Sequence, residues 1–448
     1  MPPANPQHVV LIVGGAVAGS EAAFRFAERG IRCIVVEQND RPYGKIEDGL
    51  PRWHLSLRAQ EEKKIDDKLA HPQVHFVPRT KLGHDVQLQD LLTWGLSAVV
   101  LANGAWRDRP LPLAGIERFV GRGFYYQNPF VHWFNHYPEE DYQGPTVDLA
   151  DGAIVVGGGL ASLDVAKILM LETATRLLLA RGHGVSLYEL ERAGIRKGLE
   201  ELGLSQAVLG FQGCTLIYRR RAEDMPLLEI PEGATPSQAE KARATRRRLL
   251  QNFIEKYLFT FQDQRVPVGY LAKGDRLWGL TLAATEIQGG RLTTLEQTAR
   301  EVSSRMVVSS IGSIPEPIRG IQMHGEMYRV KDLWTGEVEG PDGVFAVGNA
   351  VTGKGNILLS RKHGRVVSQH MLEQYLLGTA SGYEEVLANA ATEAQEKVGA
   401  VADRVTGQAP LPGGRVVDIL NKVKALQDRV GYPGEYRQWI ERVRLPRV

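Results

Sequence analysis

Cysteine is scarce in this chain. Its 448 residues include only two cysteines, Cys33 and Cys214, which lie far apart and each inside an apolar run. Two such thiols cannot build a four-cysteine iron–sulfur cluster, a cysteine-rich zinc site or a Cys-x-x-Cys redox disulfide. Any electron chemistry within this chain therefore needs a bound organic cofactor, and no metal site is predicted.

Net charge and long apolar runs are lacking as well. The formal charge is only +2, which does not indicate a nucleic acid or an anionic membrane as a partner. No apolar run reaches about 18 residues, and the residues before the first strand have neither the charged nor the apolar segment of a secretory signal. We expect a cytoplasmic protein that binds neither nucleic acid nor membrane.

The first 37 residues have the order strand, glycine turn, helix, strand. An apolar run at 8–13 breaks at the turn 14–19, helical periodicity follows at 20–29, and a second apolar run at 32–36 ends on Glu37. This order and length are typical of the βαβ unit of a Rossmann-like domain.

The first turn has the spacing of a dinucleotide site. Gly14 permits the tight bend, Gly19 permits close contact of helix and strand, and Ala16 replaces the middle glycine at the cost of one methyl group. Free N–H groups at the helix start suit a pyrophosphate. Glu37, 18 residues beyond Gly19, is placed to accept hydrogen bonds from the hydroxyls of an unphosphorylated ribose.

A second unit of the same kind begins with the strand 153–156 and the glycine-rich turn 157–162. Its partner strand, 214–218, ends in Arg219 and Arg220 rather than in an acid. Arginine can bind a 2′-phosphate bidentately, so the second unit favours NADP(H), with NAD(H) as the alternative. The residues expected to form this turn's cofactor face are Gly157, Gly159, Leu160 and Ser162.

The fold prediction follows from these units. We expect an α/β protein with two Rossmann-like dinucleotide-binding domains, each a three-layer structure with a parallel sheet, followed by an extra C-terminal helical segment. The first domain would be discontinuous. The expected bounds are 1–145 and 335–380 for the first domain, 146–334 for the second, and 381–448 for the helical extension.

Five stretches carry a family resemblance over roughly residues 8–378. The turn 157–166 is similar to the nicotinamide-domain turn shared by adrenodoxin reductases and glutamate synthase small subunits, and the Tyr-Arg-Arg…Met-Pro stretch at 218–226 resembles the glutamate synthase branch. The stretches 43–51 and 128–135 look instead like adrenodoxin reductase, and 348–357 occupies the place of a second FAD contact. The chain thus resembles the adrenodoxin reductase and glutamate synthase small-subunit group of flavin reductases.

The resemblance implies FAD on the first turn and NADP on the second. It implies an FAD-dependent NADPH:acceptor oxidoreductase, in which hydride passes from NADPH to flavin N5 and electrons then pass to a small redox protein such as ferredoxin or flavodoxin. Asn349 stands where related reductases often carry Asp or Trp. The remaining cofactor contacts expected are Gly44, Leu50, Gly104, Glu229, Gly348, Asn349, Gly355, Asn356 and Ile357.

Two further features could have either a functional role or a purely structural one. His54, in the flavin-side loop, is the candidate for a proton path or a nicotinamide contact, or else a packing histidine. A cationic run on an expected helix would steer an acidic ferredoxin or flavodoxin, or else be a solvated helix face. The run consists of Lys241, Arg243, Arg246, Arg247 and Arg248.

Other functions remain open from the sequence. One is an electron-input subunit of a larger complex, as in glutamate synthase, and another is a non-catalytic flavin-binding scaffold or redox sensor. A C-terminal helix near 416–430 has apolar residues at helical spacing on one face. That face would contact a second copy, contact a partner subunit or pack within the chain.

Overall fold

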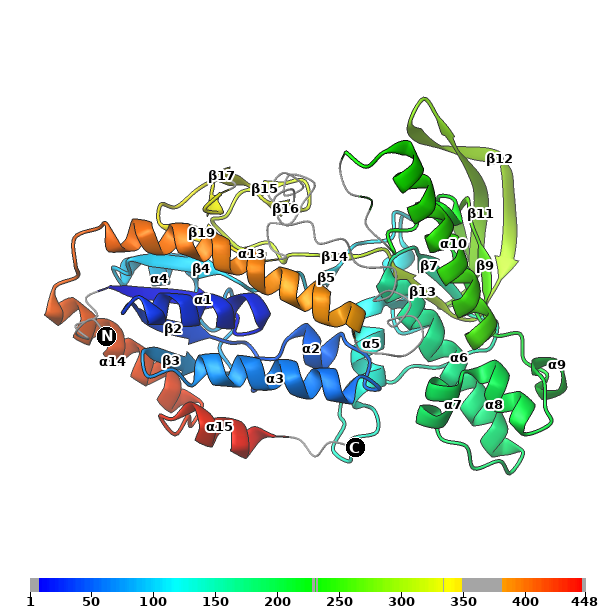
Figure 1. The fold of residues 1–448 in the computed structure, drawn as a ribbon, viewed down its shortest axis with the longest axis horizontal. Helices are drawn as coiled ribbons and strands as arrows, with labels where there is room; N and C mark the ends of the chain where they lie inside the picture. Colours follow the sequence, from blue (N-terminus) through cyan, green and yellow to red (C-terminus); the bar gives the residue numbers. More distant parts are fainter. Residues whose placement is uncertain (1–7, 228–229, 231–232, 333, 349–380, 445–448) are drawn as a thin grey trace.

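The computed structural model describes residues 8–227, 230, 233–332, 334–348 and 381–444 (Figure 1). Two parallel sheets organise the chain, one in the half at the left of Figure 1 and one in the half at the right. The predicted fold class is confirmed. Among the described residues, no helix combines the length and the apolar character needed to cross a membrane.

The first sheet has seven strands, of which β19, β4, β1, β2 and β3 run parallel. Alternate residues of β1 enter two different cores: Val10 and Ile12 face one side, and Val9, Leu11 and Val13 face the other. Burial on both faces explains why these strands are continuous apolar runs. In sheet order the strands are β17 (Val330–Asp332), β18 (Glu337–Val338), β19 (Val344–Ala346), β4 (Ala98–Leu101), β1 (Val9–Val13), β2 (Arg32–Val36) and β3 (Val74–Val77).

Helices cover both faces of the first sheet, giving three layers. One face carries α1 (Val17–Glu28), α3 (Leu55–Leu69), α13 (Ser381–Thr406) and α15 (Tyr436–Val443). The other face carries α4 (Leu88–Thr93) and α14 (Gly413–Arg429). In Figure 1, α13 runs alongside α1, and Arg29 at the end of α1 reaches Asp403 of α13 at 2.5 Å.

The C-terminal helices therefore complete the first half of the molecule. Ile419 and Val423 of α14 are fully buried against the sheet, and Trp439 of α15 is 1% exposed in the opposite core. The apolar face predicted near 416–430 thus packs within the chain. Val417, on the outer side of α14, is 56% exposed.

The second sheet has five parallel strands, with helices on one face and a three-stranded antiparallel sheet on the other. Its strands, in sheet order, are β6 (Phe124–Tyr126), β13 (Val307–Ser310), β7 (Ile154–Gly157), β8 (Thr215–Ile217) and β9 (Thr260–Gln262). Its helices are α5 (Gln127–His136), α6 (Leu160–Ala180), α7 (Leu187–Ala193), α8 (Ile195–Glu201), α9 (Gln206–Leu209) and α10 (Pro236–Tyr257). The antiparallel sheet is β10 (Arg265–Lys273), β11 (Arg276–Gln288) and β12 (Arg291–Ser303).

The crossover between the halves differs from the expected bounds. β6 pairs with β13 in the second sheet, so the chain has left the first half before residue 124 rather than near 145. It crosses at β5 (Arg107–Asp108) and returns at β14 (Ser313–Ile314), and these two strands pair antiparallel. β17 begins at 330, slightly before the expected 335.

Short elements complete the chain. Each half also holds one buried free cysteine, Cys33 on β2 and Cys214 immediately before β8. The remaining elements are α2 (Lys45–Asp48), η1 (Ile116–Phe119), η2 (Ala222–Asp224), β15 (Met323–His324) and β16 (Met327–Tyr328).

Candidate functional site

A cavity of about 730 Å³ opens at the carboxyl ends of β1, β2 and β4. Ligands of open α/β sheets bind at this edge, where the chain's turns present free backbone groups. Six of the residues predicted to bind a cofactor line the cavity. They are Gly14, Ala16, Glu37, Gly44, Gly104 and Gly348.

The turn before α1 needs its glycines. Gly14 has φ +94°, and a Cβ there would lie 2.6 Å from the carbonyl oxygen of Ala102. A Cβ on Gly19 would overlap the carbonyl oxygen of Gly14. Ala16 precedes the helix, and a Cβ on Gly44 would lie 2.9 Å from the Ala16 methyl. The methyl that replaces the middle glycine is therefore accommodated by a glycine opposite.

Glu37 is held at the end of β2 by two backbone donors. The N–H of Gly15 donates to Oε2 at 2.9 Å, and the N–H of Asn39 donates to Oε1 at 3.0 Å. The side chain is 5% exposed, and this burial raises the pKa of Glu37 to about 7 although the backbone hydrogen bonds oppose the rise. Its carboxylate borders the cavity with acceptor capacity left for a ligand hydroxyl.

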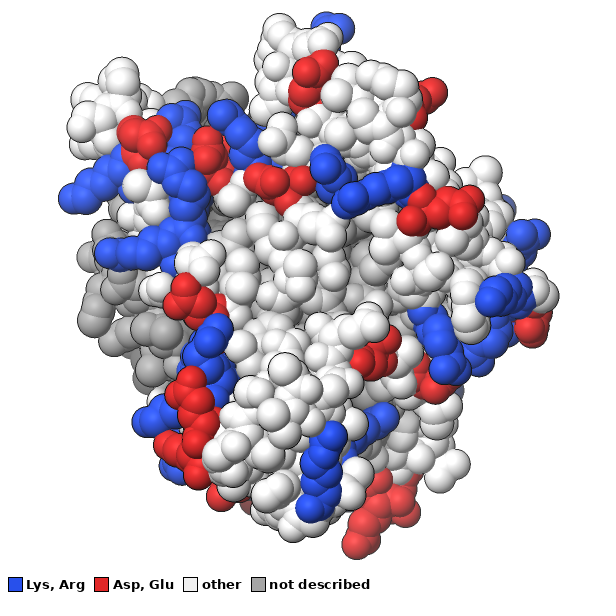
Figure 2. All heavy atoms as spheres, turned by 90° about the vertical axis from the view of Figure 1, so that its right-hand side faces the viewer, with Lys and Arg blue, Asp and Glu red and all other residues white. Residues whose placement is uncertain are grey.

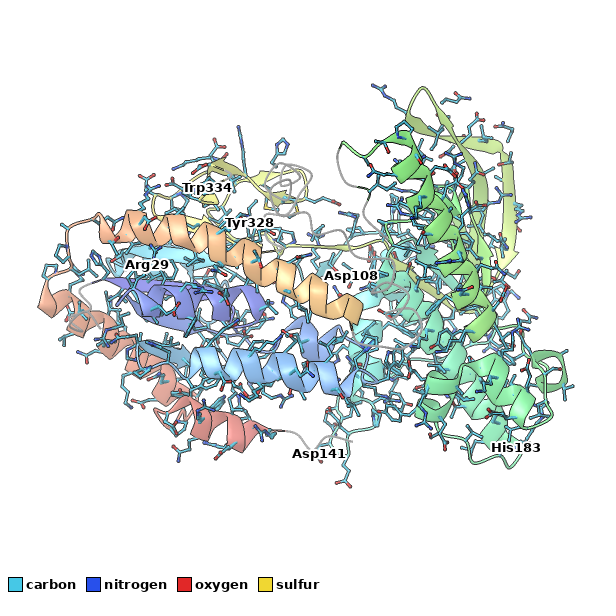
Figure 3. All side chains as sticks on the ribbon, viewed as in Figure 1. Arg29, Asp108, Asp141, His183, Tyr328 and Trp334 are labelled. Carbon is cyan, nitrogen blue, oxygen red and sulfur yellow. The ribbon has the colours of Figure 1, made fainter. Side chains whose placement is uncertain are left out.

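A polar cluster lies where the two halves meet. Lys45, which lines the cavity beside Gly44, donates from Nζ to Oγ of Ser313 at 3.1 Å, and its Nζ lies 5.9 Å from the centre of the Trp106 ring. Burial raises the pKa of Asp108 to about 6, while Lys45 opposes the rise. Figure 3 places Asp108 at this junction.

This cluster is the part of the site that the sequence analysis missed. Lys45 and Ser313 are separated by 268 positions and meet only because β5 and β14 pair. Lys45 directly follows Gly44, a residue predicted to lie against the cofactor, and that adjacency was the one available signal.

The predicted residues Leu50 and His54 are not among the described residues that line the cavity. Leu50 is 3% exposed, and its carbonyl accepts a hydrogen bond from Nδ2 of Asn135 at 3.0 Å. His54 is 6% exposed; burial, with the nearby charges of Lys167 and Arg58, lowers its pKa to about 3. His54 is therefore a neutral imidazole at neutral pH.

The second glycine turn, after β7, is closed by two side chains. The Tyr218 ring lies against Gly158 so closely that a Cβ on Gly158 would overlap it. Ser162 is fully buried, and its hydroxyl donates to the carbonyl of Gly159 at 2.6 Å. The serine is thus engaged within the turn. Leu160 begins α6, and a Cβ on Gly159 would meet nothing within 4 Å, so the backbone there is open to a ligand.

Cations gather at the end of β8. Arg219 and Arg220 are exposed, and among the described residues neither forms an ion pair within 4.0 Å. Both act electrostatically on the Tyr218 hydroxyl, as does Arg246 from α10. The predicted arginine pair is therefore accompanied by a third cation, Arg246, which belongs to the basic run predicted to steer a redox partner.

The basic run on α10 is partly neutralised. Arg247 pairs with Glu223 at 2.8 Å and with Glu240 at 3.2 Å, and Arg243 pairs with Glu240 at 3.5 Å. Lys241 is exposed. Figure 2 shows basic and acidic side chains interleaved on the face that lies at the right of Figure 1. The surface there is less positive than the sequence run alone implied.

Several predicted contacts lie outside the described residues: Glu229, Asn349, Gly355, Asn356 and Ile357. Gly348, just before that segment, has φ +66°, and a Cβ there would lie 2.9 Å from the Ala18 methyl. The backbone therefore approaches the start of α1 closely at this point.

No family model matches the chain. It is 27% identical over 248 residues to the mitochondrial NADPH:adrenodoxin oxidoreductase of Arabidopsis thaliana, covering 54% of this chain and 50% of that protein. It is 29% identical over 163 residues to the glutamate synthase [NADPH] small chain of Mycobacterium tuberculosis, covering 35% and 32%. The chain spans about half or less of the length of these relatives.

Two longer matches extend the comparison. NADPH-ferredoxin reductase FprA of Mycobacterium leprae is 24% identical over 382 residues, covering 77% of this chain and 79% of that protein. The structure of Mycobacterium tuberculosis FprA in complex with NADPH matches with a TM-score of 0.65 at 18% identity, covering 95% of this chain and 91% of FprA. The predicted resemblance is confirmed: the chain is similar in sequence to the adrenodoxin reductase and glutamate synthase small-chain group, and it has the fold of FprA.

Proposed function

We propose that the protein is an FAD-dependent NADPH:acceptor oxidoreductase. The observation that carries the proposal is the presence of two glycine turns, one on each parallel sheet. The buried acid Glu37 lies beside the first turn, and Arg219 and Arg220 lie near the second. A bound FAD would supply hydride acceptance from the nicotinamide and electron delivery to a small redox protein. The protein's own residues bind and align the two dinucleotides.

The described wall of the first cavity suits FAD. Gly14 and Gly19 let the backbone approach a pyrophosphate at the start of α1, and Glu37 would accept hydrogen bonds from the adenosine ribose. Lys45 and Trp106 stand at the other end, beside the junction of the halves. Hydride transfer needs alignment more than acid–base groups, so a site whose titratable groups are few is adequate.

The second turn suits NADP. Arg219 and Arg220 would bind the 2′-phosphate that distinguishes NADP from NAD, with Arg246 adding charge from α10. The backbone of Gly159 and Leu160 at the start of α6 would bind the pyrophosphate. Use of NADH is then weaker rather than excluded, because it lacks only the 2′-phosphate contacts.

We propose an acidic ferredoxin or flavodoxin as the acceptor. The similarity to proteins named NADPH:adrenodoxin oxidoreductase and NADPH-ferredoxin reductase supports this class. The exposed Lys241 and the cations around it would steer such a partner, less strongly than five unpaired charges would because Arg243 and Arg247 have acidic partners.

Rapid mixing of the FAD-loaded protein with NADPH tests the proposal. We expect the oxidised-flavin absorbance to be lost within seconds at saturating NADPH. If the absorbance persists, the reductase function is wrong and a non-catalytic flavin scaffold or sensor takes its place. Ferredoxin reduction measured at low and high salt then tests the acceptor, since an electrostatically steered rate falls as salt rises. A rate that does not change with salt would contradict the docking surface.

A further inference from the structure

Three metal-ligating side chains meet where the first half of the molecule contacts the second. Asp48 ends α2, and His132 and His136 lie four positions apart on α5, which places both imidazoles on one face of that helix. Nε2 of His136 lies 3.1 Å from Oδ1 of Asp48, and Nε2 of His132 lies 3.8 Å from the same oxygen. Donor atoms of the three residues all lie within 4.8 Å of one another.

These separations are close to those of a metal centre. Tetrahedral ligands at about 2.0–2.1 Å from a zinc ion lie roughly 3.3 Å apart. The two distances from Oδ1 of Asp48, 3.1 Å and 3.8 Å, bracket that value, so small side-chain rotations would bring the three donor atoms around one ion. Two imidazoles and one carboxylate are also the donor set that divalent transition metals favour, whereas Mg²⁺ and Ca²⁺ favour oxygen ligands alone.

Glu139 orients one of the ligands. Its Oε1 lies 2.7 Å from Nδ1 of His136, so the Nδ1–H donates to the carboxylate and Nε2 faces Asp48 and His132. A carboxylate on the far nitrogen of a histidine ligand fixes its tautomer and strengthens it as a donor.

The surrounding charge favours a cation. Three carboxylates act electrostatically on His132, namely Asp48, Glu139 and Glu47, and Arg41 pairs with Glu47 at 2.5 Å. This acidic surrounding suits a bound divalent cation.

We propose that Asp48, His132 and His136 form a binding site for a divalent transition metal of the Zn²⁺ class. Their side chains are 18%, 44% and 8% exposed, respectively. The site is thus anchored in the interior at His136 and open to solvent at His132, which leaves room for a water as the fourth ligand. This assignment is independent of the proposed redox function.

The metal would join the two halves. Asp48 is the last residue of α2, which packs in the first half, whereas α5 packs in the core of the second. Nδ2 of Asn135 already links α5 to α2 by donating to the carbonyl of Glu47 at 2.9 Å. A metal bound only in the folded state would add to that tie and raise the stability of the whole chain.

Zinc titration of the full chain, without any polyhistidine tag and after chelator treatment, tests the site. Calorimetry with ZnCl₂ should show one Zn²⁺ per chain, and Zn²⁺ should raise the melting temperature. His132→Gln, at the exposed ligand, should weaken binding at least about 10-fold and abolish the thermal shift while the variant itself stays folded.

His84→Gln is the matched control. His84 is 81% exposed and also lies beside an aspartate, Asp85, at 3.3 Å, but no third ligand joins them among the described residues. This variant should bind Zn²⁺ like the wild type. The proposal is overturned if wild-type protein binds no Zn²⁺ at millimolar metal, or if His132→Gln binds it as tightly as wild type and His84→Gln do.

Discussion

The backbone N–H of Gly15, inside the first glycine turn, donates a hydrogen bond to Oε2 of Glu37 at the end of β2, over 2.9 Å. One carboxylate thus shapes the turn and borders the cavity at once. Because Glu37 is buried, its pKa lies near 7 rather than at its ordinary 4.5. Its ionisation falls in the range in which the protein would be studied.

Glu37 should make FAD binding depend on pH. Ribose hydroxyls donate to the ionised carboxylate, so FAD should bind more tightly as pH rises through about 7 and should release a proton. In the absence of FAD the sign is opposite: with the folded pKa raised, this group's contribution to stability is fully present below about 4.5 and is lost as pH rises through about 7.

Titration calorimetry with FAD across this range checks the expectation. Glu37→Gln should bind FAD with little dependence on pH. Glu28→Gln, at the exposed end of α1, should keep the wild-type slope. If FAD affinity depends on pH in Glu37→Gln as it does in the wild type, Glu37 does not bind the ribose.

Replacing Arg219 or Arg220 should discriminate between the two nicotinamide cofactors. Each substitution, Arg219→Ala or Arg220→Ala, would remove a charge-assisted hydrogen bond to the 2′-phosphate that is worth about 1.5–3 kcal/mol. NADPH binding should therefore weaken roughly 10- to 100-fold, whereas NADH binding should change little. Steady-state kinetics of acceptor reduction with NADPH and with NADH measure the preference for one cofactor over the other.

Arg246→Ala should produce a smaller change in the same direction, because Arg246 approaches from α10 and also donates to the carbonyl of Glu223 at 3.0 Å. Arg243→Ala, whose partner is Glu240, should leave the NADPH to NADH ratio as it was. Equal losses for both cofactors in the Arg219 and Arg220 variants would contradict a 2′-phosphate site.

Trp439→Ala should destabilise the first half of the molecule. The indole is 1% exposed, packs with Tyr432 at a ring distance of 5.7 Å, and donates from Nε1 to the carbonyl of Asp40 at 2.8 Å. Loss of a buried tryptophan costs about 3–5 kcal/mol. Chemical denaturation should show this loss, whereas Val417→Ala, on the exposed side of α14, should stay within about 0.5 kcal/mol of wild type.

His54 should leave no signature in the pH profile of reduction near neutrality. Its pKa is lowered to about 3, so the imidazole is neutral and its favourable effect on stability is present above its ordinary 6.5 and is lost as pH falls through about 3. The rate with NADPH between about pH 6 and about pH 8 should vary in the same way for wild type and His54→Gln. If the rate of the wild type shows an ionisation in this pH range and the rate of His54→Gln does not, His54 acts as a proton donor.

The local pattern of apolar residues in the sequence predicted the strands and helices that flank the two glycine turns. The apolar run 8–13 became β1 (Val9–Val13), and the run at 32–36 became β2 without change. The long hairpins β10–β12 were missed because β12 is mostly exposed and polar, so its sequence lacks the apolar alternation of a half-buried strand. The position of β6 was missed because a three-residue strand gives no signal of which sheet it joins.

The site was predicted where it depends on neighbours in sequence and missed where it depends on the crossover. Gly14 and Glu37 belong to one βαβ unit, whose geometry is regular enough to place them in one cavity. Lys45 and Ser313 meet through the pairing of β5 and β14, and Arg246 reaches Tyr218 through the packing of α10. Such contacts depend on tertiary structure that no local spacing encodes.

The two buried cysteines give each half its own reporter. Cys33 belongs to the first sheet and Cys214 borders the second, and burial raises the pKa of both thiols. Since the thiolate is the reactive form, an alkylating reagent can label either residue only when its own half opens. Labelling each thiol over time would show whether the halves open together or one at a time, without any engineered probe.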